Sequence, residues 1–186
     1  MPSIFGHAVA GIALGFVCAE EKPPRRTWLL GAFCALAPDL DWFTAFLRVH
    51  PGNYLAHRGI THSLLGAVLI AATVLLLGFK REQRSLRTGI YLLLASLSHG
   101  LLDACTSGRV GVAFFYPFSS SRWACDWQPI QDAPLPFWSG LQLPFLGALL
   151  GEVLWIGVPA FLLAAGVQVF RRSGDWPVLP EVEPEG

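Results

Sequence analysis

The sequence predicts an all-α fold, a polytopic membrane helix bundle of about five transmembrane helices with its N-terminus outside. Only 14% of the 186 residues are charged and 53% are hydrophobic, whereas soluble domains carry roughly 25% charged residues. The apolar residues are gathered into runs about as long as a bilayer-spanning helix. The basic residues fall mostly in alternate connections between those runs, as they do in multi-pass membrane proteins.

Five hydrophobic stretches follow one another, separated by charged or Pro-rich segments: residues 4–19, 28–47, 63–79, 88–107 and about 141–170. Each is near the roughly 17 to 25 residues that a spanning helix needs. No Lys or Arg precedes the first stretch, so we expect a retained helix and not a cleaved signal peptide. In the second stretch Pro38 favours a break. Pro144 and Pro159 interrupt the fifth, which we predict to be one long helix, tilted or kinked.

The basic residues set the orientation of the bundle. Nine of the thirteen follow the first, third and fifth stretches: Lys22, Arg25, Arg26, Lys80, Arg81, Arg84, Arg87, Arg171 and Arg172. The positive-inside rule makes these connections cytoplasmic, so the N-terminus and the loops 48–62 and 105–140 lie outside. We expect one membrane-embedded helical domain over residues 1–172 and a disordered, acidic, Pro-rich tail over residues 173–186.

The overall charge excludes one class of partner. The 13 basic and 13 acidic residues cancel, and a nucleic-acid partner would need a basic face. We therefore predict no nucleic-acid partner. The sequence does not indicate the oligomeric state.

Three stretches carry an ionisable group at a similar depth. Counted from the cytoplasmic end of its stretch, His7 is twelve residues in, and Asp39 and His99 are each eleven. At 1.5 Å per residue all three lie about 17 to 18 Å from that end, in the outer half of the membrane. Ionisable groups within a membrane are costly, so such a coincidence indicates a shared functional site.

Local spacing brings further groups to that site. His99 and Asp103 are four residues apart and share a helix face. Asp39 and Asp41 would diverge on a regular helix, but a break at Pro38 lets both turn inward. We place His57 and Arg58 in an approach loop, before a helix that starts near His62 with Thr61 as its N-cap.

The candidate metal ligands are four histidines and three aspartates: His7, His57, His62, His99, Asp39, Asp41 and Asp103. This mixed nitrogen and oxygen set suits one or two divalent ions, zinc first, with manganese or iron as alternatives. In a two-metal site the ions activate a bridging water or hydroxide and hold the oxygens of a phosphoryl or acyl centre. The catalytic candidates are Asp41, Arg58 and His62. Arg58 would neutralise a substrate phosphate, whereas Asp41 is either a ligand or a general base.

Four short motifs occur in order along the chain: Pro38-Asp39-Leu40-Asp41, His57-Arg58-Gly59-Ile60-Thr61-His62-Ser63, Ser98 to Asp103, and Tyr116 to Ser119. With these motifs the sequence resembles the YdjM-like family. These are inner-membrane, predicted metal-dependent hydrolases, some linked to LexA regulation. The likeness covers residues 1–127. It implies a bacterial inner-membrane location, and it implies that the same seven side chains are the metal and catalytic residues.

A fainter likeness is to zinc-dependent phospholipase C enzymes, where the order His, Asp, His, His-x-x-x-Asp also occurs on a helical fold. The present sequence lacks their later His and His-x-x-x-Glu ligands, for which Glu152 is only a loose substitute. A full three-zinc centre is therefore not expected.

We predict a hydrolase that acts on a phosphoester or ester of a lipid or lipid-linked substrate. Two alternatives stay open: a metal-ion or proton transporter that uses the same cluster, and a noncatalytic membrane protein with a structural metal. The cytoplasmic halves of the stretches are almost wholly apolar, which counts against transport. The sequence also leaves open whether Cys105 and Cys125, both on the predicted outer side, form a disulfide.

Overall fold

A computed structural model describes residues 1–18, 23–50, 53–107, 110–132 and 143–173. In these residues the secondary structure is helical, apart from two isolated β-bridges in the segment 105–132. The all-α prediction is therefore confirmed. The predicted disordered tail lies outside the described residues, except for Ser173.

The five predicted stretches correspond to five helical runs. They are α1 (Ile4–Cys18); α2 (Arg25–Leu36), continued by a 3-10 helix (Ala37–Trp42) and α3 (Phe43–Phe46); α4 (Leu64–Gly78); α5 (Leu86–Ala104); and α7 (Leu143–Glu152), continued by a π-helical segment (Val153–Gly157) and α8 (Val158–Ser173). The interruption of the fifth run is thus a π segment just before Pro159.

The break predicted at Pro38 is confirmed, because α2 gives way to the 3-10 helix with this proline in its first turn. The predicted N-cap of the following run is wrong. Thr61 lies within a 3-10 turn, Ile60–His62, and α4 is capped instead by Ser63, whose hydroxyl accepts a hydrogen bond from the Gly66 amide at 3.0 Å. The physical reason is the extended backbone of Ser63, with ψ near 164°, which a helix N-cap requires and a residue inside a turn cannot adopt.

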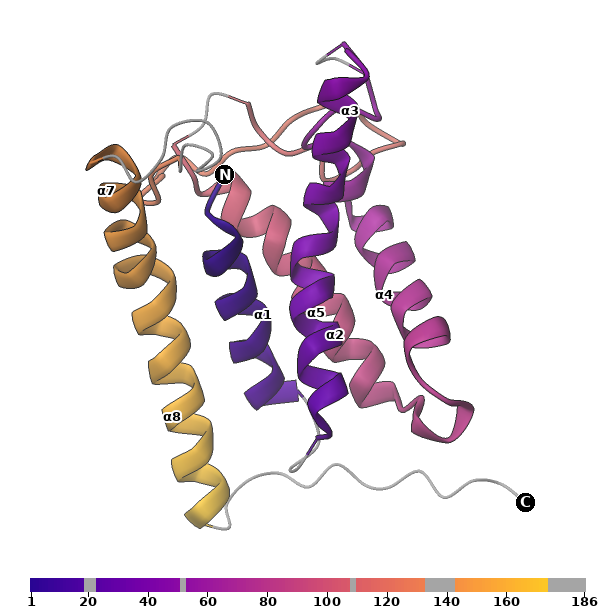
Figure 1. Ribbon diagram of the computed structural model, residues 1–186, viewed down its shortest axis with the longest axis vertical. Coiled ribbons are helices and arrows are strands. Elements are labelled where there is room, and N and C mark those ends of the chain that lie inside the picture. The colour runs from indigo at the N-terminus through magenta and orange to yellow at the C-terminus, as the bar shows by residue number, and fades with distance from the viewer. Residues whose placement is uncertain (19–22, 51–52, 108–109, 133–142, 174–186) are drawn as a thin grey trace.

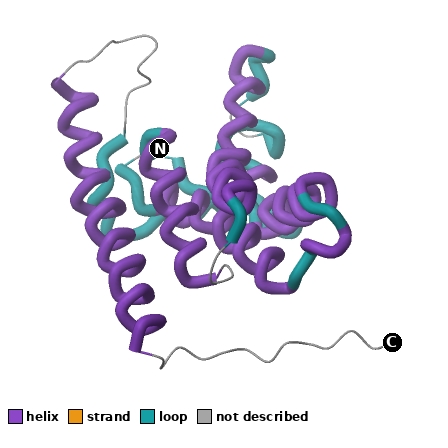
Figure 2. Tube along the Cα trace, turned by 60° about the horizontal axis from the view of Figure 1, so that its bottom comes forward, coloured by secondary structure: helices purple, strands orange, loops and turns teal. Residues whose placement is uncertain are grey.

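Helices α1, α2 and α5 pack against one another, and α4 packs on α5. Small residues permit this close packing. Gly31 of α2 faces the ring of Tyr91 on α5, and a Cβ at this glycine would overlap the ring. The α8 helix packs chiefly on α1 and stands at the edge of the bundle (Figure 2).

The two ends of the bundle differ in what they carry. The N-terminus, α3, the start of α7 and the described residues of the segment 105–132 lie at one end, and the start of α2, the connection from α4 to α5 and the end of α8 lie at the other (Figure 1). The described members of the basic group thus gather at the end opposite the N-terminus.

Among the described residues, one helical run is long and apolar enough to cross a bilayer, Phe145–Ser173, and α1 and α4 are apolar but shorter. Large apolar side chains are exposed along these helices, among them Phe161, Leu162 and Val169. An apolar surface of this kind suits a lipid environment.

A disulfide links Cys105 to Cys125, which answers the question that the sequence left open. It joins the end of α5 to the segment 105–132. The Cys125 amide also donates to the Ala104 carbonyl at 2.9 Å, and two short bridges, Thr106 to Ile130 and Val112 to Trp123, tie the segment to itself. The segment is thereby fastened just beyond Asp103.

Candidate metal centre

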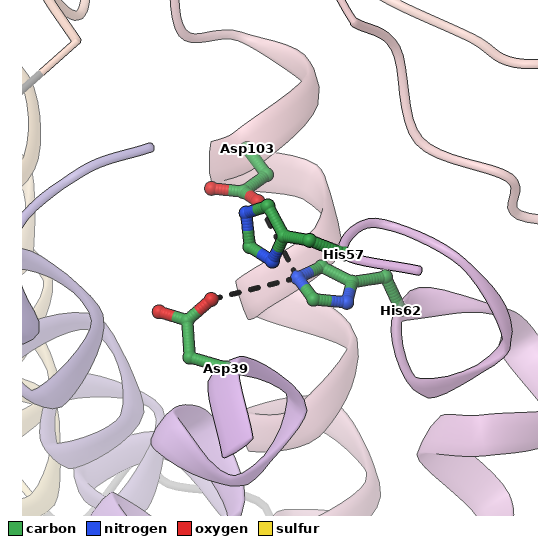
Figure 3. A group of neighbouring side chains, drawn as sticks. All are labelled: Asp39, His57, His62 and Asp103. Atoms are coloured by element: carbon green, nitrogen blue, oxygen red, sulfur yellow. Dashed lines mark ion pairs between the residues drawn. The ribbon is translucent and has the colours of Figure 1, made fainter. Parts of the chain in front are cut away.

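The seven predicted ligands converge at the end of the bundle that holds the N-terminus. They come from four segments: His7 from α1, Asp39 and Asp41 from the 3-10 helix, His57 and His62 from the residues before α4, and His99 and Asp103 from α5. Figure 3 shows Asp39, His57, His62 and Asp103 pointing toward one another from three of these segments. The shared depth predicted for His7, Asp39 and His99 agrees with this arrangement.

The centre of the cluster is the Nε2 atom of His62. It lies 3.0 Å from Nε2 of His99, 3.4 Å from Oδ2 of Asp103 and 3.6 Å from Oδ1 of Asp39. The same Asp39 oxygen is 3.2 Å from Nε2 of His99. Two imidazoles and two carboxylates therefore direct one atom each at a common point.

Hydrogen bonds on the far side of each ring indicate which nitrogen carries the proton. Nδ1 of His99 lies 2.7 Å from the carbonyl oxygen of Ala35, which can only accept, so this nitrogen donates. Nδ1 of His62 lies 3.2 Å from a carboxylate oxygen of Asp41, which makes it a donor too. In the neutral rings both Nε2 atoms then carry lone pairs, which face each other at 3.0 Å.

A second group lies beside the first. The His7 ring stacks on the His99 ring with centroids 3.8 Å apart, and its Nε2 is 3.6 Å from Oδ1 of Asp103. Two sets of side chains each offer ligand atoms within 4.8 Å of one another: Asp39, His57, His62 and Asp103, and His7, His99 and Asp103. Asp103 belongs to both sets, one oxygen facing each, so the cluster has groups for one or two ions.

Unsatisfied buried atoms supply an independent test of whether a metal fits. Both ring nitrogens of His7 and both carboxylate oxygens of Asp39 and Asp103 are buried without a hydrogen-bond partner. Burying such atoms without a hydrogen bond is costly, and of these carboxylate oxygens Oδ2 of Asp103 has the Arg58 guanidinium 3.1 Å away. A divalent cation would satisfy one ligand atom of each of these residues, and mixed imidazole and carboxylate ligands suit zinc, manganese or iron without selecting among them. The residues present therefore fit a divalent metal.

Asp41 lies behind two of the imidazoles. Its Oδ1 is 2.8 Å from Nδ1 of His57, and its Oδ2 is 3.2 Å from Nδ1 of His62 and accepts from the Thr61 hydroxyl at 2.6 Å. This is the carboxylate to histidine contact that orients ligands in metal sites. The structure thus places Asp41 on the side of the rings remote from their Nε2 atoms.

Arg58 is buried and engaged within the protein. Its Nε lies 3.1 Å from Oδ2 of Asp103, and its Nη1 donates to the Val110 carbonyl. Its own carbonyl accepts from the Ala113 amide and from Nη1 of Arg122, each at 3.2 Å. Burial, followed by the charge of Arg58, lowers the pKa of Arg122. Arg58 therefore joins Asp103 to the segment 105–132, and its role toward a substrate phosphate stays a prediction.

The cluster is most open beside His57 and Asp39, whose side chains are 26% and 14% exposed. The other side chains of the two sets, those of His7, His62, His99 and Asp103, are fully buried. Leu40 follows Asp39 directly in the 3-10 helix and Phe43 begins α3 four residues after Asp39; they are 67% and 69% exposed. The accessible edge of the site is thus bordered by apolar surface.

Three contacts of the site could not be predicted from the sequence. The Ala35 carbonyl orients His99, Thr61 bonds Asp41, and the Val110 carbonyl holds Arg58. Of the residues in these contacts, only Thr61 lies in a motif that the sequence singled out, the string from His57 to Ser63. Glu152 does not extend the centre, because it bonds Ser3 instead.

Comparison with known proteins agrees with these observations. A family model described as YdjM inner membrane protein matches residues 1–174. The inner membrane protein YbcI of Escherichia coli (strain K12) is 32% identical over 174 residues, which cover 92% of this chain and 99% of that protein. No solved structure matches.

Proposed function

The chain belongs to the YdjM family of inner membrane proteins, and from this premise we propose that it is a metal-dependent hydrolase embedded in the membrane. Its substrate would be a phosphoester or ester of a lipid or lipid-linked molecule. The observation that carries the proposal is the meeting of two imidazole lone pairs and two carboxylate oxygens at one buried point. The Arg58 guanidinium offsets one of the two carboxylate charges, and with neutral imidazole rings a bound cation would offset the remaining negative charge.

The chain's own residues would divide the work as follows. Asp39, His57, His62 and Asp103 would hold one ion, and His7, His99 and Asp103 a second. When bound, the ions would supply Lewis-acid activation of a water and of the phosphoryl or acyl centre. Both oxygens of Asp41 are engaged by His57 and His62, so it would orient ligands in preference to acting as general base. In the reaction, water adds to phosphorus or carbon, the ester bond breaks and the alcohol departs with a proton.

We also propose that the five helical runs all cross the bacterial inner membrane, with the N-terminus outside. The exposed apolar side chains along α1, α4 and α8 support this. A second observation also supports it: the described basic group and the Cys105 to Cys125 disulfide lie at opposite ends of the bundle. Disulfides persist in the periplasm and basic loops stay in the cytoplasm. The cluster would then face the periplasm.

The apolar border of the accessible edge supports a lipid substrate. Leu40 and Phe43 would contact acyl chains, because they are exposed and lie within four residues of the partly exposed Asp39 in the chain. A headgroup could then reach the cluster while its chains stay in the bilayer.

The deciding experiment is metal analysis of the purified full-length protein in detergent. We expect one or two divalent ions per chain, a marked loss in His99→Ala, and no loss in the control His50→Ala, which changes a histidine of the outer loop. The same three preparations are then assayed with phosphoester and carboxylester lipids in mixed micelles. A metal content near zero in the unmodified protein would contradict the proposal, and so would a metal-loaded protein that hydrolyses no lipid.

One observation favours transport as a second candidate. The Tyr91 hydroxyl and the Ser96 hydroxyl, on the same helix as His99, are buried without a hydrogen-bond partner. These two hydroxyls place polar atoms between the cluster and the end of the bundle that carries the basic group. Metal uptake into proteoliposomes that is abolished by Asp103→Ala would support this candidate. A purely structural metal would instead be indicated by unfolding on chelation with no hydrolysis and no uptake.

A further inference from the structure

Glu152 is a buried carboxylate that the proposed metal centre does not use. Its residue is only 3% exposed, and it lies where α7 passes into the π-helical segment. Its two oxygens accept from the backbone amide and from the hydroxyl of Ser3, the residue that precedes α1. The last residue of α7 thus binds the residue that precedes the N-terminus of α1.

The contact continues into the first turn of α1. The Ser3 hydroxyl also accepts from the Gly6 amide at 3.4 Å, and the Ser3 carbonyl accepts from the His7 amide at 3.3 Å. The Gly6 amide is one that a helix N-terminus leaves without an intrahelical partner, and the His7 amide makes the first i to i−4 hydrogen bond of α1. A carboxylate at this position is also favoured by the helix dipole. Glu152 is therefore connected to the backbone of His7 through one intervening residue.

Glu152 lies very close to the backbone of α1, which leaves little freedom for the two to move relative to each other. A Cβ at Gly6 would lie 2.9 Å from Oε2 of Glu152 and 3.0 Å from Cδ1 of Ile156. Only glycine lets the carboxylate come this near to α1. The π-helical segment begins directly after Glu152, and such segments re-aim side chains relative to a regular helix.

We infer that Glu152 is a positioning residue for the metal centre. Its hydrogen bonds to Ser3 fix the first turn of α1 along and around the helix axis, and this fixes the position of the His7 ring. The inference rests on the proposed metal function. His7 must keep its stack on His99 and its approach to Asp103, and no other member of the cluster comes from α1. The long C-terminal helix thereby acts on the cluster without contributing a ligand.

The test is a double-mutant cycle with zinc affinity as its readout, measured by competition with a chelator. Glu152→Leu should weaken zinc binding about 10- to 100-fold, the usual cost of losing an orienting contact. Glu152→Gln should have an intermediate effect, since it keeps one acceptor oxygen. In a His7→Ala background Glu152→Leu should change the affinity no further. The visible spectrum of the cobalt-substituted protein should change in Glu152→Leu.

Leu154→Ala is the matched control, because this exposed residue lies in the same π-helical segment; it should bind zinc like the unmodified protein. If Glu152→Leu does not fold, Ser3→Ala and Gly6→Ala probe the same contact. Unchanged affinity in the folded Glu152 or Ser3 variants overturns the inference, and so does an equal loss with and without His7. An unmodified protein that binds no zinc, manganese or iron overturns the metal centre itself, which is seen before any variant is compared.

Discussion

At the scale of single residues, the chemistry of the cluster depends on which ring nitrogen each histidine presents. A histidine can offer either nitrogen, and the hydrogen bond at one decides the state of the other. For His99 the partner is a backbone carbonyl of α2, and for His62 it is Asp41. Both partners turn Nε2 toward Asp39 and Asp103, so the rings are prepared for a cation before one binds.

Asp41→Asn tests this orientation. An asparagine cannot accept from His57 and His62 together, because one of its two polar atoms is a donor. We expect the affinity for the divalent metal to fall about 10- to 100-fold, as measured by chelator competition. The control is Asp126→Asn, which changes an exposed carboxylate of the segment 105–132. Metal affinity equal to that of the unmodified protein would show that Asp41 does not orient these rings.

At the scale of secondary structure, the 3-10 helix after α2 explains how Asp39 and Asp41 both reach the cluster. With about 3.0 residues per turn, residues two apart point about 120° from each other, against about 160° on an α-helix. Asp39 therefore meets the Nε2 atoms of His62 and His99 while Asp41 meets Nδ1 of His57 and His62. The change of helix type at Pro38 thus places two carboxylates on opposite sides of the His62 ring, with Asp39 also at His99 and Asp41 also at His57.

The segment 105–132 is the second element that the site depends on. It holds Arg58 through Val110 and Ala113, and the disulfide fastens it two residues after Asp103. Covalent closure of this loop restricts the unfolded chain.

Replacing both Cys105 and Cys125 by alanine should therefore lower the free energy of unfolding by about 3 kcal/mol. Thermal or denaturant unfolding in detergent measures this change, and a non-reducing peptide map of the unmodified protein should contain the linked pair. The control is Cys34→Ala, whose thiol is buried in the helical core away from this segment. A map with both cysteines as thiols would contradict the prediction.

At the scale of the whole molecule, charge and ligands separate along the bundle axis. The described basic group lies at the start of α2, around the connection from α4 to α5 and at the end of α8, whereas the cluster lies near the N-terminus. By the positive-inside rule, the end of the bundle with the basic group is expected on the cytoplasmic side and the cluster on the opposite side.

Accessibility to a membrane-impermeant thiol reagent in intact cells checks this orientation. In a chain with Cys18→Ala and Cys34→Ala, the exposed positions Ser120 and Gln83 are replaced by cysteine one at a time. Ser120→Cys should react from outside, and Gln83→Cys only after the cells are opened. The two positions are controls for each other, and the reverse pattern would place the cluster on the cytoplasmic side.

Much of this molecule could be predicted from local properties of the chain. Hydrophobic runs predicted the helical elements, with α1 and α4 within a residue of their observed bounds, because burial of apolar side chains acts on consecutive residues. The depth of His7, Asp39 and His99 and the four-residue spacing of His99 and Asp103 predicted a common site. The N-cap of α4 was wrong by two residues, since a backbone angle and not residue type decides between Thr61 and Ser63.

The helical class, the candidate ligands and their common level could thus be predicted from residue type and spacing along one element. Which atoms meet follows from the packing of the whole chain: Nε2 of His62 lies against His99, Asp41 lies behind the rings, Arg58 pairs with Asp103 and Glu152 bonds Ser3. These contacts join segments far apart in the chain. Their geometry depends on how whole helices pack, which no spacing within a single helix specifies.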